Sequence, residues 1–569
     1  MTYSKGNAEA RVMNFHLFLS KTSKHYVGLQ KTRNCKVWLT FIAAFALSWS
    51  LTADVKMPKI FSDNMVLQRD MPVPVWGWAD KNEKVTVSFK GQEKTATAGE
   101  DGKWMVKLDP LKASKESSEL IVTSSIDIRQ MKIKNVLVGE VWVCSGQSNM
   151  NCPLRDVLNS KDEIESSTQP LIRHIKLQPE WSPTKRDDIV GAPWVTASPY
   201  TTATHFSAVG YFFARDIVKE LDVPVGLIGS NHGGTAIEPW TPLEGYRQVA
   251  ELKDFLRQVE EWDSSTEAGR AKYLEYLEKL KEWIPRAEKA CADKQGISEP
   301  PTPPQPPANI QPPQKLFNGM ISPLIPYAIR GVIWYQGESN PGIGYLPRMK
   351  ALIGGWRQLW QQGDFPFYFV QLASYRASDP NHPEGGDGFA AVREAQFQSL
   401  DIANVGMAVT IDIGDAANIH PPNKQDVGRR LALWALAKDY PSTTLRAGGK
   451  AADLVYSGPL YKNFKVEGNK IRIAFDHADS GLFIGKKEGL EPPKEIKEGK
   501  LGWISSAGAD KKFYFADAMI DGQTLVVSSD KVPNPVAVRY HFTANPDGLH
   551  LYNREGLPAS PFRTDNWDR

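Results

Sequence analysis

Between residues 54 and 135, apolar and polar positions alternate in short runs that are separated by turn residues. Alternation with a period of two places successive side chains on opposite faces of a strand, and regularly spaced short strands are typical of β-sandwiches. We therefore predict an N-terminal β-sandwich domain over residues 54–135. The runs that carry the pattern are VPVWGWAD, KVTVSFKG, WMVKLDP and SELIVTS.

Between residues 136 and 440 the pattern changes to continuous apolar runs that are followed by loops and by helices with one apolar face. Strands that are apolar on both faces indicate a parallel sheet covered by helices on both sides. We expect an α/β domain over 136–440 and, where short alternating strands return, a β-rich domain over 441–569. The apolar runs are VLVGEVWVC, VPVGLIGS, IRGVIWYQ, FPFYFVQL and VGMAVTIDI, and the helical segments are FSAVGYFFARDIVKEL, YLPRMKALIGGWRQLW and KQDVGRRLALWALAKDY.

The α/β pattern is interrupted over residues 243–314. This segment carries the highly charged helical sequence LEYLEKLKEWIPRAEKA and then a proline-rich stretch from Pro300 to Pro313. Proline lacks the backbone N–H that a helix interior or a central strand needs, so the stretch cannot belong to the sheet. We predict an accessory insertion, helical first and proline-rich afterwards.

The N-terminus has the pattern of an export signal. Basic residues precede an apolar run from Val37 to Leu51, and small residues follow it up to Ala53. The run is shorter than the roughly 20 residues that a membrane-spanning helix needs. We predict a signal peptide over 1–53, cleavage after Ala53, export to the periplasm or the exterior, and no stable membrane insertion after cleavage. An uncleaved signal anchor is the alternative.

Composition narrows the possible partners. The 68 basic and 65 acidic side chains give a net charge of +3, spread along the chain, which does not favour binding to nucleic acid. The four cysteines show no C-x-x-C or Cys/His spacing, so we predict neither a metal site nor a cofactor. The 17 tryptophans could stack on sugar rings, although packing in the core explains most of them equally well.

Polar, glycine-rich motifs follow four of the predicted parallel strands. Ligands of open α/β sheets bind beyond the carboxyl ends of the strands, so these motifs are expected to meet at one edge. In chain order the motifs are Ser145-Gly146-Gln147-Ser148-Asn149-Met150, then Asn231-His232-Gly233-Gly234-Thr235, then Gln336-Gly337-Glu338-Ser339-Asn340, and finally Gly414-Asp415 with Ile419-His420-Pro421.

The residue types in these motifs suit acyl transfer by a serine. Ser148 lies at a strand-to-helix turn, where a hydroxyl is exposed and a backbone N–H can face a developing oxyanion, although a helix N-cap is the alternative. Gly234 could add a backbone N–H, and Gln336 or Asn340 a side-chain donor. His420 is the candidate base, because it follows the last predicted parallel strand and precedes two prolines.

The blocks GEVWVCSGQSNM, IGSNHGGTAIEPW, LFNGMISPLIPYAIRGVIWYQGESN and TIDIGDAANIHPPNKQDVGRRLA resemble the sialate O-acetylesterases of the SGNH hydrolase superfamily. The flanking IFSDNMVLQRDMPVPVWGWA and GLPASPFRTD resemble that family too. The resemblance implies a flavodoxin-like α/β/α hydrolase domain with flanking β-domains, no metal, and release of acetate from O-acetylated sugars. Ser148 and His420 match the family's nucleophile and base. We also expect Gln147, Asn149, His232 and Glu338 to contact the substrate.

The acid of the triad departs from the superfamily pattern. That pattern is Asp-x-x-His, whereas Ala417 stands three residues before His420. Asp415 is our first choice because it lies on the loop itself, and Asp412 is the second. A backbone carbonyl could instead orient the imidazole and leave a Ser-His dyad.

The substrate is less sharply defined by the sequence. Acetyl xylan and other polysaccharide esterases share the G-Q-S-N and Q-G-E-S blocks, so they are the main alternative. A sialate site should offer a cation to the substrate carboxylate, and Arg155 and Arg393 are candidates. A non-catalytic carbohydrate-binding protein is the alternative from another class, and intact Ser148 and His420 argue against it. The oligomeric state is not predicted.

Overall fold

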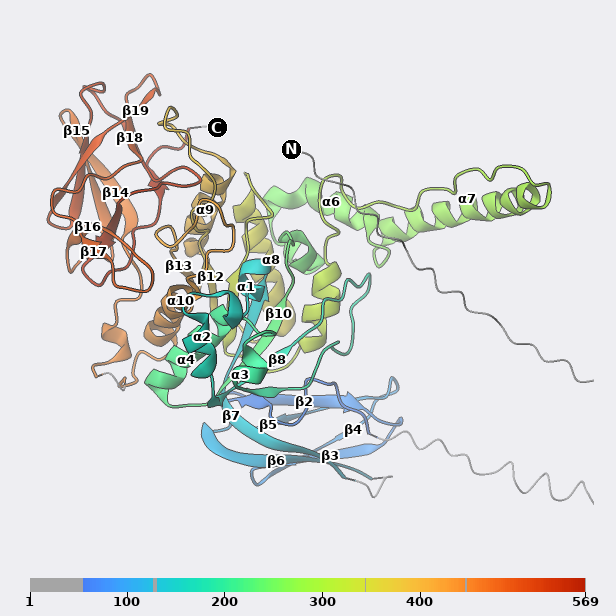
Figure 1. The fold of residues 1–569 in the computed structure, drawn as a ribbon. Helices are drawn as coiled ribbons and strands as arrows, with labels where there is room; N and C mark the ends of the chain where they lie inside the picture. The colour runs from blue at the N-terminus through green and yellow to red at the C-terminus, as the bar shows by residue number, and fades with distance from the viewer. Residues whose placement is uncertain (1–54, 126–129, 343, 446–447, 568–569) are drawn as a thin grey trace, which may run out of the picture. The chain divides into compact units, whose positions relative to one another are not determined.

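The structure is a computed structural model that describes residues 55–125, 130–342, 344–445 and 448–567. The predicted signal peptide over 1–53 lies outside the described residues. None of the helices in these ranges has the length and the apolar character that a membrane span requires. The predicted α/β class is confirmed, because helices surround a central parallel sheet and further sheets flank it (Figure 1).

The N-terminal region is built from short antiparallel strands with alternating burial. In β2 the valines point inward, whereas the tryptophans Trp76 and Trp78 are partly exposed. β2 pairs with β5, β3 pairs with β4 and β6, β6 pairs with β7, and β1 runs parallel to β7. The strands are β1 (Val66–Gln68), β2 (Val73–Trp78), β3 (Lys84–Phe89), β4 (Gln92–Thr97), β5 (Lys103–Leu108) and β6 (Ser114–Ser124).

A single long strand, β7 (Gln130–Gly146), joins this region to the central sheet. Its first half pairs with β1 and β6, and its second half pairs with β10 and β11. The domain boundary predicted between residues 135 and 136 therefore falls inside one continuous strand. The two regions share a strand, so we expect them to unfold together.

The central sheet has the order β13-β12-β11-β7-β10-β8-β9, and only the edge strand β9 is antiparallel to its neighbour. If β8 is set aside, the order of the parallel strands is 2-1-3-4-5, as in flavodoxin-like sheets. β8 is an additional parallel strand outside β10. The strands are β8 (Gln169–Lys176), β9 (Val195–Ala197), β10 (Val225–Asn231), β11 (Gly331–Tyr335), β12 (Phe367–Val370) and β13 (Val405–Ala408).

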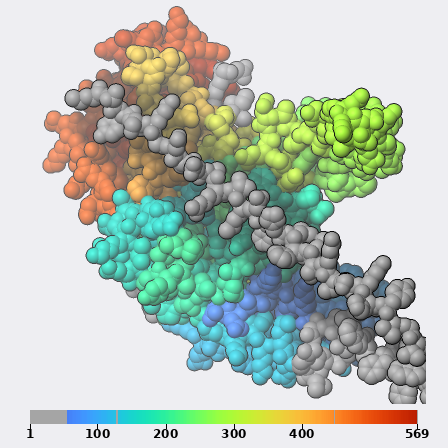
Figure 2. All heavy atoms as spheres, turned by 45° about the vertical axis from the view of Figure 1, so that its right-hand side comes forward, coloured from blue at the N-terminus to red at the C-terminus, as the bar shows by residue number. Residues whose placement is uncertain are grey.

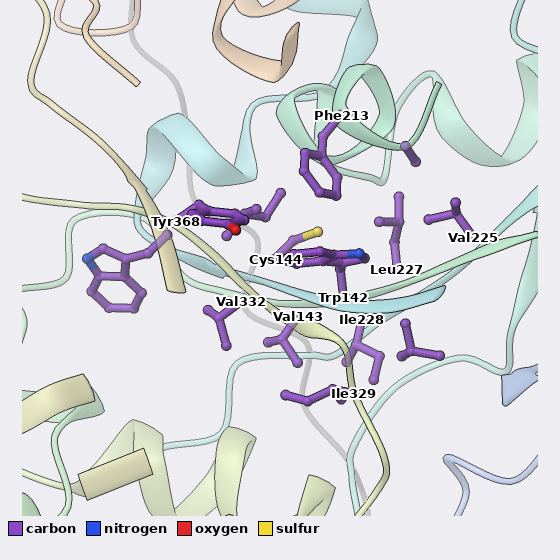
Figure 3. Packing of buried hydrophobic residues seen from close by; sticks show 14 of the residues in the cluster. Trp142, Val143, Cys144, Phe213, Val225, Leu227, Ile228, Ile329, Val332 and Tyr368 are labelled. Carbon is purple, nitrogen blue, oxygen red and sulfur yellow. The ribbon is translucent and has the colours of Figure 1, made fainter. Parts of the chain in front are cut away.

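Large aromatic side chains fill the space between the sheet and the helices on each face. On one face Trp142 packs against Phe213 of α4, with ring centroids 5.0 Å apart, and against Tyr368 of β12. On the other face Trp334 packs against Trp356 of α8 at 6.2 Å. Figure 3 shows Trp142 on one side of β7 and the adjacent Val143 on the other. The main helices are α4 (Ala208–Leu221), α8 (Tyr345–Trp360), α9 (Gly388–Gln398) and α10 (Lys424–Asp439), and the shorter ones are α1 (Ser148–Asn151), α2 (Ser160–Glu165), α3 (Pro199–Thr202) and α5 (Leu243–Tyr246).

The insertion forms a helical arm that reaches away from the sheet (Figures 1 and 2). It contains α6 (Lys253–Trp262) and the long helix α7 (Glu267–Ala292), and the proline-rich segment then returns toward the sheet. The indole N–H of Trp283 donates to the carbonyl of Ser298 at 3.0 Å, which holds the returning segment against α7. The arm ends where the side chains of Gln311 and Gln314 accept hydrogen bonds from the backbone N–H groups of Ala236 and Leu243.

After α10 the chain forms three small antiparallel sheets. Buried hydrogen bonds join them to the α/β region. The guanidinium of Arg393, in α9, donates to the carbonyls of Thr543 at 2.9 Å and Ala544 at 2.6 Å. The sheets are β14 (Leu460–Glu467), β15 (Lys470–Asp476), β21 (Thr524–Ser528) and β20 (Asp517–Asp521); β17 (Lys494–Glu495), β16 (Leu482–Lys486) and β23 (His550–Asn553); and β19 (Phe513–Phe515), β18 (Ile504–Ala507), β22 (Ala537–Tyr540) and β24 (Phe562–Arg563).

The buried carboxylate of Glu140, in the middle of β7, offers a test of this architecture. It accepts hydrogen bonds from Arg69, from Arg330 at 2.7 Å and from Gln68 at 3.0 Å. Burial opposes its ionisation, but the two guanidinium groups outweigh burial and hold the pKa of Glu140 below its usual value. Glu140→Gln should therefore lower the free energy of unfolding by about 2–3 kcal/mol, measured by urea denaturation at neutral pH.

This contribution should disappear as the pH falls through the lowered pKa, because the native carboxylate then takes up a proton. Glu275→Gln is the matched control, since Glu275 makes a fully exposed pair with Lys279 on α7. It should leave the denaturation midpoint nearly unchanged. Equal midpoints for the two variants would contradict the structural role of Glu140.

Candidate active site

Three strands end at the same level in the sheet and bring three of the sequence motifs together. Gly146 at the end of β7 pairs with Asn231 of β10 on one side and with Tyr335 of β11 on the other. Gly146 has φ +130°, and a Cβ there would lie 2.2 Å from the carbonyl oxygen of Tyr335. Only glycine fits this position, so the chain can turn sharply into Ser148.

Ser148 is the first residue of α1, and its hydroxyl lies beside the imidazole of His420. The distance between Ser148 Oγ and His420 Nε2 is 2.7 Å. His420 is exposed on the loop between β13 and α10. Partial burial and the positive charge of Lys424 both lower the pKa of His420. A neutral imidazole at this distance can accept the proton of the serine hydroxyl.

The structure does not bring the expected acid to the imidazole, and the prediction for Asp415 is corrected. The carboxylate of Asp415 accepts a hydrogen bond from the N–H of Ala417, 2.9 Å away, and so closes a turn within its own loop. Asp415 also lines a hollow of about 530 Å³ between this loop and the C-terminal strands. In the described part of the chain, no carboxylate hydrogen-bonds to His420.

Asp412, the second choice, has a structural role instead. Its side chain is fully buried and makes a two-pronged ion pair with Arg430 of α10, at 2.6 and 2.8 Å. An Arg–carboxylate fork of this kind fixes the start of the His420 loop against α10. The remaining possibility from the sequence, a Ser-His dyad, fits the observed contacts.

The glycine turn Gly233-Gly234 lies next to Ser148. Gly233 contacts Ser148 directly, because a Cβ at Gly233 would lie 3.5 Å from the Cβ of Ser148. Gly234 follows with φ +72° and is exposed. Gln311 fixes this turn: its Nε2 donates to the carbonyl of Gly234 at 2.8 Å, and its Oε1 accepts from the N–H of Ala236 at 2.9 Å.

The side chains of Gln336 and Asn340 do not supply the predicted oxyanion donors, which corrects that expectation. Gln336 is fully buried, and its Nε2 donates to Gln147 Oε1, to the carbonyl of Thr235 and to Asn340 Oδ1. The Nδ2 of Asn340 donates to the buried carboxylate of Glu238 at 3.0 Å. The N–H groups of both amides already have partners inside the protein, so they are not free to bind a substrate oxygen.

Of the four predicted substrate contacts, Gln147 and Asn149 are buried, and Glu338 is half-buried with a buried carboxylate oxygen. The Oε1 of Gln147 accepts from the backbone N–H of Ser339, which ties the Ser148 turn to the loop after β11. Asn149 is 1% exposed, and its Nδ2 donates to Glu338 Oε1 at 2.5 Å. We therefore correct the expectation for Gln147, Asn149 and Glu338: their polar side-chain atoms bond to neighbouring loops of the protein.

His232 keeps a position that is compatible with substrate contact. It is half-buried, its N–H donates to the carbonyl of Gly146 at 3.1 Å, and its ring meets the partly exposed ring of Trp181 edge-on at 6.0 Å. Of the two candidate cations for a substrate carboxylate, Arg393 is fully buried and does not fit. Arg155 is exposed and lies beside Asp156.

Sequence reasoning missed Lys424, Gly233 and Gln311. The Gly-Gly doublet was a signal for Gly233, although the pattern did not say which glycine touches the serine. A lysine at the start of a helix is expected on the surface, yet Lys424 at the start of α10 is fully buried. Gln311 lies in the proline-rich segment, where nothing in the sequence points to the site. The described residues contain no cluster of three or more His, Cys, Asp or Glu side chains that could hold a metal ion.

Comparisons with known proteins point to one family of esterases. A family model described as "Carbohydrate esterase, sialic acid-specific acetylesterase" matches residues 138–280 and 309–437, which include Ser148 and His420 and leave out the tip of the arm. The rat sialate O-acetylesterase is 30% identical over 445 residues, which are 71% of this chain and 76% of the rat protein.

The human sialate O-acetylesterase is 28% identical over 548 residues, which are 88% of this chain and 91% of the human protein. A crystal structure described as a novel carbohydrate acetylesterase from Xanthomonas citri is 33% identical with a TM-score of 0.72, and the match covers 90% of this chain and 100% of that chain. The chain therefore belongs to the sialate O-acetylesterase family of carbohydrate esterases.

Proposed function

We propose that this protein is a serine esterase that hydrolyses O-acetyl esters on carbohydrates, with O-acetylated sialic acids as the first candidates. Family membership supports the reaction class, a carboxylic ester hydrolysis. The observation that carries the mechanism is the 2.7 Å contact between Ser148 Oγ and His420 Nε2. Both residues lie within the segments that match the family model.

In the first step His420 Nε2 takes the hydroxyl proton of Ser148 while Oγ attacks the carbonyl carbon of the acetyl ester. The backbone N–H groups of Ser148, Gly233 and Gly234 are the candidate donors to the oxyanion that forms. One well-placed donor is worth about 3–4 kcal/mol of transition-state stabilisation. The imidazolium then protonates the departing sugar oxygen, which leaves an acetyl group on Ser148.

In the second step a water molecule gives its proton to His420 and attacks the acetyl carbonyl. The proton returns to Ser148 Oγ as acetate leaves, so the enzyme is regenerated. His420 must be neutral to act as a base. Because its pKa is lowered, the acid limb of kcat/KM should lie below about pH 6.5, where an ordinary histidine titrates.

The finer description of the fold is also a proposal. The strand order around β7, with Ser148 directly after the first strand, supports an SGNH-type, flavodoxin-like α/β/α hydrolase domain. The two facing layers of short strands before β7 support an N-terminal β-sandwich. The three sheets after α10 support the C-terminal β-rich domain predicted over residues 441–569.

The carbohydrate that carries the acetyl group has two candidates. The names of the rat and human relatives favour O-acetylated sialic acid. The Xanthomonas protein is named only as a carbohydrate acetylesterase, so acetylated xylan or another polysaccharide is the second candidate. Arg155 is the remaining candidate from the sequence for a contact with a sialate carboxylate.

Ser148→Ala should abolish acetate release from an O-acetylated sialic acid, because the nucleophile is lost. The variant should fold normally, since Ser148 is partly exposed and its hydroxyl hydrogen-bonds, among the described residues, to the side chain of His420 alone. Turnover is measured by acetate release, and folding by circular dichroism. A folded variant that keeps more than about a tenth of wild-type turnover would contradict the assignment of Ser148 as the nucleophile. Acetylated xylan, assayed in parallel, separates the two candidate substrates.

Asp415→Asn should change kcat little, because the carboxylate closes a turn and does not touch His420. Loss of a true triad acid lowers kcat by about four orders of magnitude. Asp412→Asn should instead lower the midpoint of thermal unfolding, since it breaks the buried pair with Arg430. A collapse of kcat in Asp415→Asn, with the fold retained, would restore the triad.

Export is proposed from the N-terminal pattern alone. Mass spectrometry of the secreted protein should find a mature N-terminus close to Asp54, because cleavage is expected after Ala53. Recovery of an intact N-terminus from the membrane fraction would favour the signal-anchor alternative.

A further inference from the structure

A chain of buried hydrogen bonds lies directly beneath the exposed Ser148–His420 pair. Lys424 Nζ donates to Asn149 Oδ1 at 2.5 Å. Asn149 Nδ2 donates to Glu338 Oε1 at 2.5 Å and to the carbonyl oxygen of Ile419 at 2.9 Å. The side chain of Asn149 thus stands between a lysine and a glutamate, with a backbone carbonyl as its third partner.

Burying the charged groups of Lys424 and Glu338 costs desolvation free energy, which indicates that they have a function beyond stability. Lys424 is fully buried, and Asn149 is 1% exposed. The second oxygen of Glu338 is also buried, and it has no hydrogen-bond partner among the described residues. An apolar layer of similar volume is often as stable as a buried ion pair, so stability alone does not explain the arrangement.

The position of Asn149 explains what the network holds together. Asn149 follows the nucleophile Ser148 in the chain, and Ile419 precedes the base His420. Lys424 is the first residue of α10, the helix that follows the His420 loop. One amide side chain therefore fixes the backbone beside the nucleophile against the backbone beside the base.

We propose that Asn149, Lys424 and Glu338 are positioning residues that take the place of a triad carboxylate by holding His420 in line with Ser148. The proposal rests on the serine-esterase function proposed above. In a serine triad the acid fixes the position and the tautomer of the histidine through a hydrogen bond to the imidazole ring. Here the restraint acts through the backbone on either side of the reacting groups.

The charges of the network give it an electrostatic role that can be measured. Lys424 faces Cys152 after α1, Tyr335 of β11 and Glu338 in the loop after β11. Burial lowers the pKa of Lys424 to about 8, and burial raises the pKa of Glu338. The charge of Lys424 also contributes to the lowered pKa of His420. The lysine thus helps to keep the base neutral.

The decisive variant is the double substitution Lys424→Met/Glu338→Gln, which removes both charges and leaves no unpaired buried ion. Hydrolysis of p-nitrophenyl acetate is measured as a function of pH. We expect kcat to fall about tenfold or more with little change in KM, because the reacting groups are no longer aligned. The acid limb of kcat/KM should move to higher pH, since the cation near His420 is gone.

Two further variants separate positioning from general effects on the fold. Asn149→Ala removes the amide that joins the two backbone segments and changes no charge. It should lower kcat and retain KM, and it tests the positioning role even if the double variant folds poorly. Lys176→Met is the control: Lys176 is a half-buried lysine whose pKa burial also lowers to about 8, and it bonds to Asn151 and Asn231. Because Lys176 does not act on His420, its loss should leave the acid limb in place.

The outcomes distinguish this inference from the proposed function. If Ser148→Ala is inactive while the folded network variants keep wild-type kcat and an unshifted acid limb, only the positioning role is overturned. A raised KM with unchanged kcat would also overturn it, in favour of substrate binding. If Ser148→Ala retains wild-type turnover, the proposed function and the positioning role both fall.

Discussion

The common end point of three parallel strands is the constraint on which the site depends. Gly146, Asn231 and Tyr335 lie opposite one another in the hydrogen-bond ladder, so the loops that follow β7, β10 and β11 start at one place. A parallel ladder fixes this register along its whole length. The nucleophile, the glycine turn and the Gln336 loop therefore meet, although they are about 100 residues apart in the chain.

The site has an exposed reactive layer above a buried polar layer. The reactive layer contains Ser148, which is half-buried, and His420, which is exposed. Below them Gln336 contacts Gln147, the carbonyl of Thr235 and Asn340, and accepts from the hydroxyl of Tyr345 at 2.6 Å. Buried amides are tolerated when their donors are paired, and here each pairing joins one loop to another. The buried layer thus gives the exposed layer its geometry.

The sequence predicted what depends on local pattern. Buried strands have continuous apolar runs, and polar residues that follow such a strand are expected at its carboxyl edge, which pointed to Ser148 directly after β7 and to His420 in the loop between β13 and α10. The α/β class followed from the same pattern. The position of β8 outside β10 and the continuity of β7 across residue 135 did not, because strand order depends on pairing between distant segments.

The sequence could not predict the direction in which the polar side chains of the site point. Gln147, Asn149, Glu338 and Asn340 occur in the right motifs, yet their side chains turn inward. Whether an amide faces a substrate or a neighbouring loop is decided by partners that are far away in sequence. Asp415 is the converse case, since a local turn with Ala417 satisfies its carboxylate and keeps it from the imidazole.

The central claim is that Ser148 carries the acetyl group during turnover. The direct measurement is rapid acid quenching of the enzyme with an acetylated substrate, followed by peptide mass spectrometry. The account predicts one added acetyl group, on the peptide that contains Ser148, and no such adduct in His420→Ala. Steady turnover with no acetylated peptide, or with the acetyl group on a different residue, would contradict it.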